Sequence, residues 1–478
     1  MKLRSLALIT VVGLAFSGSM ARGDWPTARG NAQRTGNVDG KAGPKSPKVL
    51  WVYESTDHYI STGSPGGNAF FVPALGTLNS GVMSAFSTDP AAAGPKRILW
   101  SKSQPFLKLP TVCAPAIVGG RAIFGDGMHQ NSNPTLYCVD AAGGAAVWQL
   151  QLPGDLYHIE GTPTVGADGK AYFGGGSAGV ICIDTNKVTL DGKETDAAAV
   201  ARTIAARWKE LQAKYEEDKK KDPDFAIPPS EDALPKPAPK VLWRQGAGDA
   251  GGGKTWHVDA PVALAGDRVL AASAYLDTEK TGDRAVYCLG ANDGQVKWRA
   301  ETKFNPWGGP SVSGDLVLVG CSSVRFDPDL LTGAQGEVMA IGLSDGQVKW
   351  RKDAGAGVLS PVACANGLAI FTTTDKKVVA LDEKTGEQKW KYEARAPFFA
   401  GVAVAGDVVY AADLNGVVHA IDLADGRGRW RLDVGKQTKA PGRIYGSPVV
   451  DNGRLYVSTC NLDSTDAKKT LVVCIGEK

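Results

Sequence analysis

The chain has 478 residues, of which 43% are hydrophobic and 22% are charged, so it is long enough to bury a large core. Its 59 glycines and its short runs of strand-forming residues favour many short strands joined by tight turns, which predicts an all-β fold. The 53 basic and 50 acidic residues give a net charge of only +3, without a basic block, and this excludes the electrostatic pattern of a nucleic-acid-binding protein.

The first residues have the three parts of a signal peptide. Lys2 and Arg4 precede an apolar run over residues 6–16, and small residues follow up to Ala21. The run is too short for a membrane-spanning helix, which needs about 20 apolar residues, and no cysteine follows it to carry a lipid. We therefore expect cleavage after Ala21, an extracytoplasmic mature chain without a transmembrane segment, and an N-terminal extension over residues 22–45.

A tryptophan recurs at one position of an internal repeat. The hexapeptide Asp-Gly-Gln-Val-Lys-Trp ends at Trp298 and again at Trp350, and a second form, Pro-Lys-Val-Leu-Trp, occupies residues 47–51 and 239–243. Spacings of 49, 48, 95, 55, 52, 40 and 40 residues between the repeated tryptophans are typical of propeller blades with one insertion. The eight tryptophans, which we predict to dock each blade on the next, are Trp51, Trp100, Trp148, Trp243, Trp298, Trp350, Trp390 and Trp430.

Each repeat contains four short apolar runs. In the tightest copy they are residues 360–363, 368–371, 378–381 and 388–390, which we interpret as strands A to D of one blade. The Asp-Gly or Thr-Gly before each tryptophan is a hairpin signal, because glycine supplies the positive φ that a tight turn needs.

The last repeat ends after its third strand and has no tryptophan strand of its own. The N-terminal strand at residues 47–51 supplies one if it pairs with residues 471–474. Such pairing closes the ring and leaves no exposed edge strand. Residues 46–478 are therefore predicted to form one eight-bladed β-propeller closed by an N-terminal strand.

The longest interval between repeated tryptophans contains an insertion at residues 187–238, within the third blade. Thr195 or Asp196 is a suitable N-terminal cap, and a proline-rich linker ends the segment. Apolar residues with helical spacing follow the cap: Val200, Ile204, Trp208, Leu211 and Tyr215. We predict a helix between strands C and D, whose apolar stripe packs on the propeller wall or, alternatively, docks a partner.

Eight cysteines are present, without a Cys-x-x-Cys motif or an adjacent pair. Four of them occupy a strand position where sister repeats have alanine, so a small buried side chain explains them without chemistry. The even count does not fix any disulfide pairing.

The loops that enter strand A and the B-to-C loops meet at one mouth of a propeller channel. Two motifs there, Tyr157-His158-Ile159-Glu160 and Trp256-His257-Val258-Asp259, place a histidine and a carboxylate on adjacent blades, and His129 falls in a similar loop. Such a set is able to bind a divalent metal. However, His158 precedes its proline by five residues and His257 by four, so the two motifs are out of register by one. We therefore expect a hydrogen-bonded polar lining and no metal.

Other residues enter the same mouth. Trp307 and Arg443, with Phe399 and Tyr445, are candidates for an aromatic and basic rim, which is typical of interaction surfaces. His419 lies inside a C strand and is interpreted as a packed or paired residue.

The segment Ala380-Leu381-Asp382-x-x-Thr385-Gly386-x-x-x-Trp390 resembles the tryptophan-docking repeat of the quinoprotein-like, or PQQ-binding-like, propellers, and the copy ending at Trp430 agrees. The resemblance covers residues 47–478, and residues 24–30 resemble the opening of exported members. It implies the propeller fold. The family includes PQQ-dependent alcohol dehydrogenases and the non-enzymatic BamB-like factors of outer-membrane protein assembly.

The residues favour the BamB-like branch. A PQQ enzyme needs a planar slot, a neighbouring cation such as Ca²⁺, an arginine and a carboxylate base. Trp307, Arg443, Glu160 and Asp259 are single candidates that no motif joins, and the adjacent-cysteine element of the alcohol dehydrogenases is missing. We therefore expect an exported, non-catalytic module that binds a protein or cell-envelope ligand without a cofactor. The alternative is a PQQ-dependent alcohol or sugar dehydrogenase with its site at the channel mouth.

Overall fold

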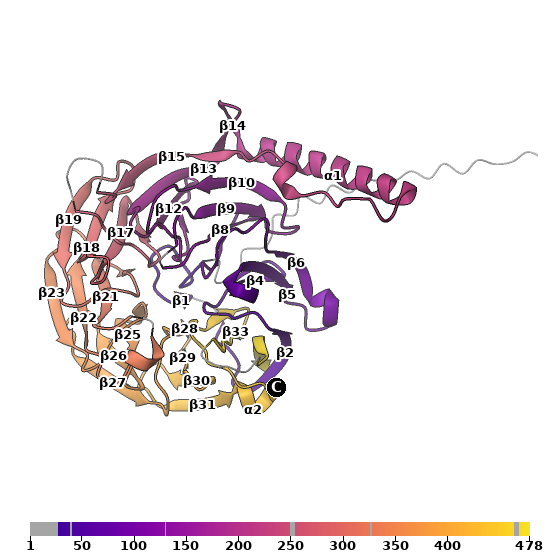
Figure 1. Ribbon diagram of the computed structural model, residues 1–478. Helices are drawn as coiled ribbons and strands as arrows, with labels where there is room; N and C mark the ends of the chain where they lie inside the picture. Colours follow the sequence, from indigo (N-terminus) through magenta and orange to yellow (C-terminus); the bar gives the residue numbers. More distant parts are fainter. Residues whose placement is uncertain (1–26, 39–40, 130, 249–253, 326, 463–467) are drawn as a thin grey trace, which may run out of the picture.

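The computed structural model describes residues 27–38, 41–129, 131–248, 254–325, 327–462 and 468–478 (Figure 1). These residues form eight β-sheets around one central axis, which confirms the predicted eight-bladed β-propeller. The predicted signal peptide at residues 1–21 lies outside the described residues. Within the described ranges, no helix is both long and apolar enough to span a membrane.

Each blade contains four antiparallel strands, A to D, of which strand A is innermost, because the A strands of adjacent blades contact one another. Blade 1 contains β3 (Ser64–Gly66), β4 (Ala69–Leu75), β5 (Gly81–Ser87) and β6 (Ile98–Lys102). Blade 2 contains β7 (Ala116–Val118), β8 (Arg121–Gly125), β9 (Thr135–Asp140) and β10 (Ala146–Gln151). Blade 3 contains β11 (Thr164–Val165), β12 (Lys170–Gly174), β13 (Val180–Leu190) and β15 (Ala238–Gln245). Blade 4 contains β16 (Ala263–Ala265), β17 (Arg268–Leu276), β18 (Thr281–Gly290) and β19 (Val296–Glu301).

The second half of the ring repeats this pattern. Blade 5 contains β20 (Ser311–Ser313), β21 (Leu316–Ser322), β22 (Gly336–Gly342) and β23 (Val348–Asp353). Blade 6 contains β24 (Ala363–Ala365), β25 (Leu368–Thr372), β26 (Lys377–Asp382) and β27 (Gln388–Glu393). Blade 7 contains β28 (Ala403–Ala405), β29 (Val408–Ala412), β30 (Val417–Asp422) and β31 (Gly428–Asp433). Blade 8 contains β32 (Val449–Asp451), β33 (Arg454–Ser458), β34 (Thr470–Glu477) and β2 (Pro47–Ser55).

Blade 8 closes the ring in the predicted way. The N-terminal strand β2 pairs antiparallel with the C-terminal strand β34, and Trp51 lies opposite Cys474. Each of these strands alone would leave an open sheet edge. Their pairing therefore joins the two ends of the chain and removes that edge.

The repeated tryptophans dock adjacent blades. The indole Nε1 of Trp350 donates a hydrogen bond to the carbonyl oxygen of Glu383 in the next blade, at 2.9 Å, and Gly386 of that blade lies against the ring. The same donor bond is made by Trp100, Trp243, Trp298, Trp390 and Trp430. Trp243 and Trp430 are only half-buried, whereas the other six repeated tryptophans are buried. The docking glycine is thus needed both for its positive φ and for its contact with indole.

An N-terminal plug, residues 27–38, occupies the channel, which sequence reasoning did not predict. Its backbone carbonyls at residues 32, 33, 35 and 36 accept hydrogen bonds from Leu264, Val312, Cys364 and Val404, in the A strands of blades 4 to 7. The short strand β1 (Asn37–Val38) pairs parallel with β28. The plug thus fastens four consecutive blades from the inside.

Arg34 extends the contacts of the plug to blade 3. Its guanidinium is buried and donates to the carbonyl oxygens of Thr162, at 2.8 Å, and Val262, at 3.1 Å, and to the Thr164 hydroxyl. Burial lowers the pKa of Arg34 to about 9. The plug therefore contacts blades 3 to 7.

The predicted helix is present between strands C and D of blade 3. Helix α1 (Ala197–Lys221) begins after Asp196, whose side chain accepts a hydrogen bond from the Ala199 amide at 2.8 Å. Val200 and Ile204 are buried against β10 and β13. Trp208 and Leu211 are partly buried and pack on the same apolar cluster, and beyond them α1 extends away from the ring (Figure 1). The apolar stripe therefore packs on the propeller wall as far as Leu211.

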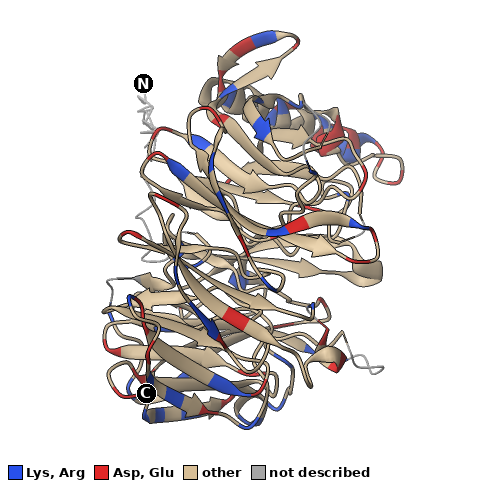
Figure 2. Ribbon diagram, turned by 90° about the vertical axis from the view of Figure 1, so that its left-hand side faces the viewer, with Lys and Arg blue, Asp and Glu red and all other residues tan. Residues whose placement is uncertain are grey.

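Smaller elements complete the fold. Strand β14 (Lys193–Asp196) pairs with the end of β13, and the remaining helices are η1 (Thr77–Asn79), η2 (Gly94–Arg97), η3 (Glu231–Ala233), η4 (Pro328–Leu330) and α2 (Val434–Thr438). All eight cysteines are buried free thiols. Figure 2 shows acidic and basic residues interspersed over the side that it displays, in agreement with the small net charge.

Candidate functional site

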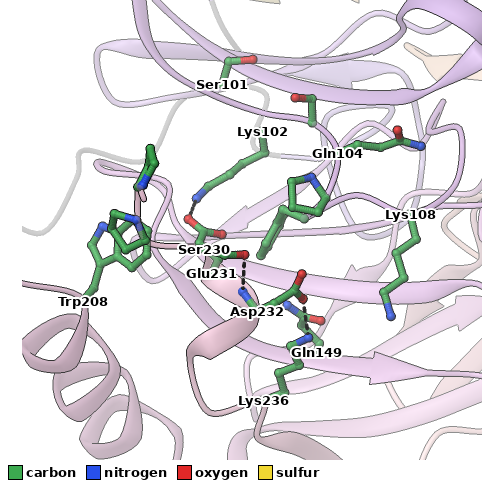
Figure 3. Close-up of a pocket in the computed structure, with 15 residues that line it drawn as sticks. Ser101, Lys102, Gln104, Lys108, Gln149, Trp208, Ser230, Glu231, Asp232 and Lys236 are labelled. Carbon is green, nitrogen blue, oxygen red and sulfur yellow. Dashed lines mark hydrogen bonds and ion pairs between the residues drawn. The ribbon is translucent and has the colours of Figure 1, made fainter. Parts of the chain in front are cut away.

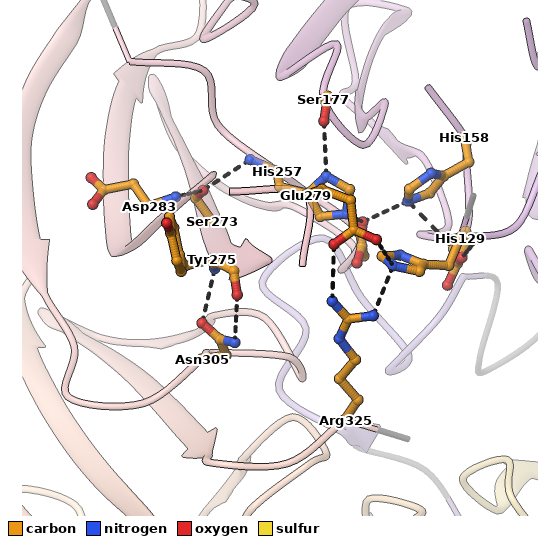
Figure 4. Close-up of polar contacts among 12 residues, drawn as sticks. His129, His158, Ser177, His257, Ser273, Tyr275, Glu279, Asp283, Asn305 and Arg325 are labelled. Carbon is orange, nitrogen blue, oxygen red and sulfur yellow. Dashed lines mark hydrogen bonds and ion pairs between the residues drawn. The ribbon is translucent and has the colours of Figure 1, made fainter. Parts of the chain in front are cut away.

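Three histidines and one aspartate meet at the mouth formed by the D-to-A and B-to-C loops (Figure 4). One ring nitrogen of each histidine and one carboxylate oxygen all lie within 4.8 Å of one another. We call this group the histidine cluster: His129, His158, His257 and Asp259. His129 follows strand B of blade 2, His158 precedes strand A of blade 3, and the other two residues precede strand A of blade 4.

The one-residue difference in register does not keep the two histidine motifs apart, so that part of the sequence argument was wrong. The Ile159 amide donates to the carbonyl of Asp126 at 3.0 Å, and the Val258 amide donates to Gly176 in the corresponding place on the next blade at 3.0 Å. In both loops the histidine therefore directly precedes the residue whose backbone amide is hydrogen-bonded to the neighbouring blade, and we call that residue the anchor. The extra residue lies after the anchor, between Ile159 and Pro163.

Asp259 lies between two of the imidazoles. Its Oδ1 is 2.7 Å from Nε2 of His158 and 3.0 Å from Nε2 of His257. The contact to His158 is a hydrogen bond, whereas His257 Nε2 is buried without hydrogen-bond geometry. Both of these histidine side chains are fully buried, and that of His129 is 26% exposed. The cluster is therefore closed on one side and reachable from the side of His129.

Residues of blades 3, 4 and 5 surround the cluster. Ser177 Oγ is 3.0 Å from Nδ1 of His257, and Glu160 accepts a hydrogen bond from the backbone amide of His129 at 2.6 Å. Glu279 and Arg325 approach Nε2 of His129 to 3.8 and 3.0 Å. Sequence reasoning missed Ser177, Glu279 and Arg325, because they lie in B-to-C loops of different lengths that share no motif.

In the histidine cluster, burial and the neighbouring charges shift the pKa values of His158 and Asp259 in opposite directions. Burial disfavours the charged form of His158, but the charge and hydrogen bond of Asp259 outweigh it and raise the pKa of His158 to about 9. Burial likewise opposes ionisation of Asp259, yet His257 and His158 hold its pKa well below the usual range. Burial raises the pKa of Glu160 and lowers that of His129. Without a bound cation, Asp259 is thus a carboxylate beside a protonated imidazole.

The other sequence-predicted mouth residues do not join this cluster. Trp307 is buried in an apolar group with Leu331, Leu359, Phe399 and Leu414, which come from the loops of blades 5 to 7. Tyr445 packs on the same group, and Arg443 forms a β-bridge with Cys460 in blade 8. His419 is hydrogen-bonded to Asp413 and Tyr392, which confirms its interpretation as a paired residue.

The residues do not fit a quinone site. The plug is hydrogen-bonded to A strands inside the channel, and the apolar group around Trp307 contains residues from several blades. Glu160 and Asp259 face histidines, and Trp307 packs among apolar side chains. Within the part of the chain that the structure describes, the four candidates therefore do not converge on one planar slot.

A second hollow lies outside the ring, where the insertion meets blades 1 and 2 (Figure 3). This cavity of about 380 Å³ is lined by Trp208 and residues 228–232 of the insertion and by residues 101–106 and Gln149 of the blades. Lys102 forms an ion pair with Glu231 across it. The return segment of the insertion is therefore tied to blade 1.

Comparison with known proteins places the chain among propellers. The family described as "Outer membrane protein assembly factor BamB" matches residues 306–471. No curated protein matches the chain. BamB from Moraxella catarrhalis is 15% identical, with a TM-score of 0.56 over 90% of this chain and 97% of that chain. Quinohemoprotein alcohol dehydrogenase from Comamonas testosteroni is 13% identical, with a TM-score of 0.57 over 96% of this chain and 82% of that chain.

A computationally designed protein, Ika8, is 10% identical, with a TM-score of 0.55 over 91% of this chain and 99% of that chain. Sequence identities this low show a common fold and nothing more. The family match over residues 306–471 falls on the tightest repeats, in blades 5 to 8. Residues 306–471 thus match the BamB family model, and the chain as a whole shares the β-propeller fold of these structures, with the repeat of docking tryptophans that resembles PQQ-like propellers.

Proposed function

We propose that this chain is an exported, non-catalytic propeller that binds a protein of the cell envelope through its insertion arm, residues 187–238. The observation that carries the proposal is a pair of exposed apolar side chains just past α1. Phe225 is 82% exposed and Ile227 is 86% exposed. The two residues are only two positions apart, so both large apolar side chains lie in water at the same place on the chain. Adjacent large apolar side chains left in water favour an interaction site.

The arm is held at both of its ends. Val200 and Ile204 are buried at the start of α1, and Glu231 pairs with Lys102 of blade 1 on the return. Between these anchors α1 extends away from the ring (Figure 1), and Phe225 and Ile227 follow its C-terminal end in the sequence. Preorganised display of this kind lowers the entropy cost of binding a partner.

Export and the absence of catalysis rest on further arguments. Residues 1–21 have signal-peptide character, and the BamB family match over residues 306–471 agrees with an extracytoplasmic role. The plug speaks against the alternative, a PQQ-dependent dehydrogenase, because it occupies the channel. We therefore favour binding over oxidation of an alcohol or sugar.

Site-specific photo-crosslinking in cells of the source organism tests the arm. A photoreactive amino acid at position 225 or 227 is expected to capture one and the same envelope protein. The control is position 78, because Leu78 is 97% exposed but lies in blade 1, outside the arm. Equal capture from position 78, or none from the arm, would contradict the proposal.

The alternative has its own test. The purified protein, supplied with PQQ and Ca²⁺ and assayed by dye reduction with primary alcohols and aldose sugars, is expected to show no turnover. Turnover above the protein-free rate would establish the dehydrogenase and refute the non-catalytic role.

A further inference from the structure

We propose that the histidine cluster binds one divalent transition-metal ion, of the Zn²⁺ type, through four protein ligands. The sequence alone favoured a metal-free lining, because the two histidine motifs are out of register. The geometry removes that objection, since both loops present their histidine directly before an equivalent backbone anchor. The inference is independent of the proposed binding role of the arm.

The spacing of the three rings fits tetrahedral coordination. Zn–N bonds of about 2.0–2.1 Å place the centres of two imidazoles on one tetrahedral ion about 5.2 Å apart. The observed ring centroids are 5.1 Å apart for His158 and His257, and 5.7 and 5.6 Å from His129 to these two. The rings are steeply inclined to one another, at 62° to 84°. Small movements of side chains are thus enough to close the shell.

Unpaired buried nitrogens are the second observation. His257 Nε2 points into the cluster and has no hydrogen bond, while its Nδ1 meets the hydroxyl of Ser177 at 3.0 Å. If Nδ1 carries the proton and donates to Ser177, the lone pair of Nε2 faces the cluster. This arrangement orients an imidazole as a metal ligand.

The chain contains an internal comparison for this point. His419 is also buried and also contacts an aspartate, but both of its ring nitrogens are hydrogen-bonded, to Asp413 and to Tyr392. In the histidine cluster, Nε2 of His257 faces Asp259 without a hydrogen bond, and Nδ1 of His158, on the side of the ring away from Asp259, is also buried without one. An ordinary hydrogen-bonded lining therefore explains His419 but leaves the cluster unsatisfied.

The charges around the cluster match a divalent cation. Three carboxylates, Asp259, Glu160 and Glu279, contact the histidines, and Arg325 is the one guanidinium among these contacts. With neutral imidazoles this set has a net charge of two negative units, which a divalent ion balances. Imidazole and carboxylate ligands favour Zn²⁺, Fe²⁺ or Ni²⁺ over Ca²⁺.

Four protein ligands form a closed shell, which is typical of structural sites. The ligands come from loops of blades 2, 3 and 4, so the ion links three consecutive blades. The partial exposure of His129 provides a route for the ion to enter. We therefore expect the metal to stabilise this sector of the ring.

The test uses full-length mature protein that has been treated with chelator and then dialysed. Titration with Zn²⁺ in a calorimeter is expected to give one site per chain, and Co²⁺ is expected to give the visible absorption of a tetrahedral complex. The melting temperature is expected to rise when Zn²⁺ is added. No stoichiometric binding of either ion would overturn the proposal.

Variants locate the site. Because the buried histidines can be needed for folding, the main variant is His129→Asn, at the exposed edge, which is expected to weaken Zn²⁺ binding at least 100-fold while leaving the fold intact. Ser177→Ala, which removes only the partner of His257, is expected to weaken it 10- to 100-fold. His58→Asn, in another loop of the same protein, is the control and should bind as the parent does. Unchanged binding in the His129 and Ser177 variants would place the ion elsewhere and overturn the assignment.

Discussion

Replacement of Trp350 tests how the blades are held together. The side chain is only 8% exposed, and burial of a tryptophan removes about 150–250 Å² from water. At about 25 cal/mol/Å² this is worth about 4–6 kcal/mol. Partial collapse of the neighbours reduces the loss in Trp350→Ala to about 3–5 kcal/mol. Trp350→Phe keeps most of the area but loses the donor to Glu383, and we expect it to cost about 1–2 kcal/mol.

A double-mutant cycle makes the test specific for docking. A Cβ at Gly386 would lie 2.8 Å from the Trp350 ring, and Gly386 has a φ of +70°. Gly386→Ala should therefore cost about 1–2 kcal/mol for the backbone and about 1–3 kcal/mol for the clash. In Trp350→Ala/Gly386→Ala the clash is gone, so the double variant should lose less than the sum by about 1–3 kcal/mol.

Equilibrium unfolding in urea measures these free energies, with circular dichroism and tryptophan fluorescence as two probes whose agreement supports a single transition. Additive losses in the cycle, or a loss below about 1 kcal/mol for Trp350→Ala, would refute the reasoning that this indole is the contact between blades 5 and 6.

Three further predictions concern other parts of the ring. Deletion of residues 46–52 should lower the melting temperature of the whole protein, because β2 closes blade 8; a truncated chain that melts like the parent would contradict this closure. Arg34→Met should cost about 1–3 kcal/mol in urea unfolding for each buried acceptor of the channel wall that it leaves unpaired, whereas Arg34→Lys should recover part of the loss; equal stability of the Met and Lys variants would argue against the anchoring role. Burial raises the pKa of Asp126 to about 6, so its contribution to stability is complete below pH ~3.8 and is lost as the pH rises through about 6, by about 3 kcal/mol in total. Asp126→Asn should remove that part of the fall in unfolding free energy between pH 4 and pH 7, and an unchanged pH dependence would show that this carboxyl is not responsible.

The fold was predictable because the contact between adjacent blades is made by a tryptophan that recurs at one position of the sequence repeat. The spacing of the tryptophans sets the blade length, and the missing tryptophan strand at the C-terminus points to β2 as the closing strand. Val200 and Ile204 likewise mark the anchored part of α1 by their helical spacing. In each case side-chain burial carries the structure, and burial leaves an apolar pattern in the sequence.

The plug and the histidine cluster leave no such pattern. The plug binds the A strands mostly through its own backbone carbonyls, which every residue type possesses, so only Arg34 is specific to its role. For the cluster, counting from the prolines failed because the loops are anchored at Ile159 and Val258 instead. Glu279 and Arg325 arrive from loops of different length, so spacing alone does not bring them together.

Several contacts outside the repeat lie in the sector where the repeat is most interrupted, in addition to the plug contacts and the apolar group around Trp307 in blades 4 to 7. Blade 3 contains the insertion, and Trp148, which packs in the same apolar cluster as the start of α1, is buried without the indole hydrogen bond that six other repeated tryptophans make; Trp51 also lacks this bond. In place of the missing bond of Trp148, α1 packs against β10, Arg34 bonds to Thr162 and Thr164, and the histidine cluster joins blades 2, 3 and 4. Opening one interface between blades exposes the apolar faces of two sheets to water, so the least stable interface limits the stability of the ring. The non-repeat contacts thus compensate the joint that the insertion weakens, so the ring can carry the arm and remain closed.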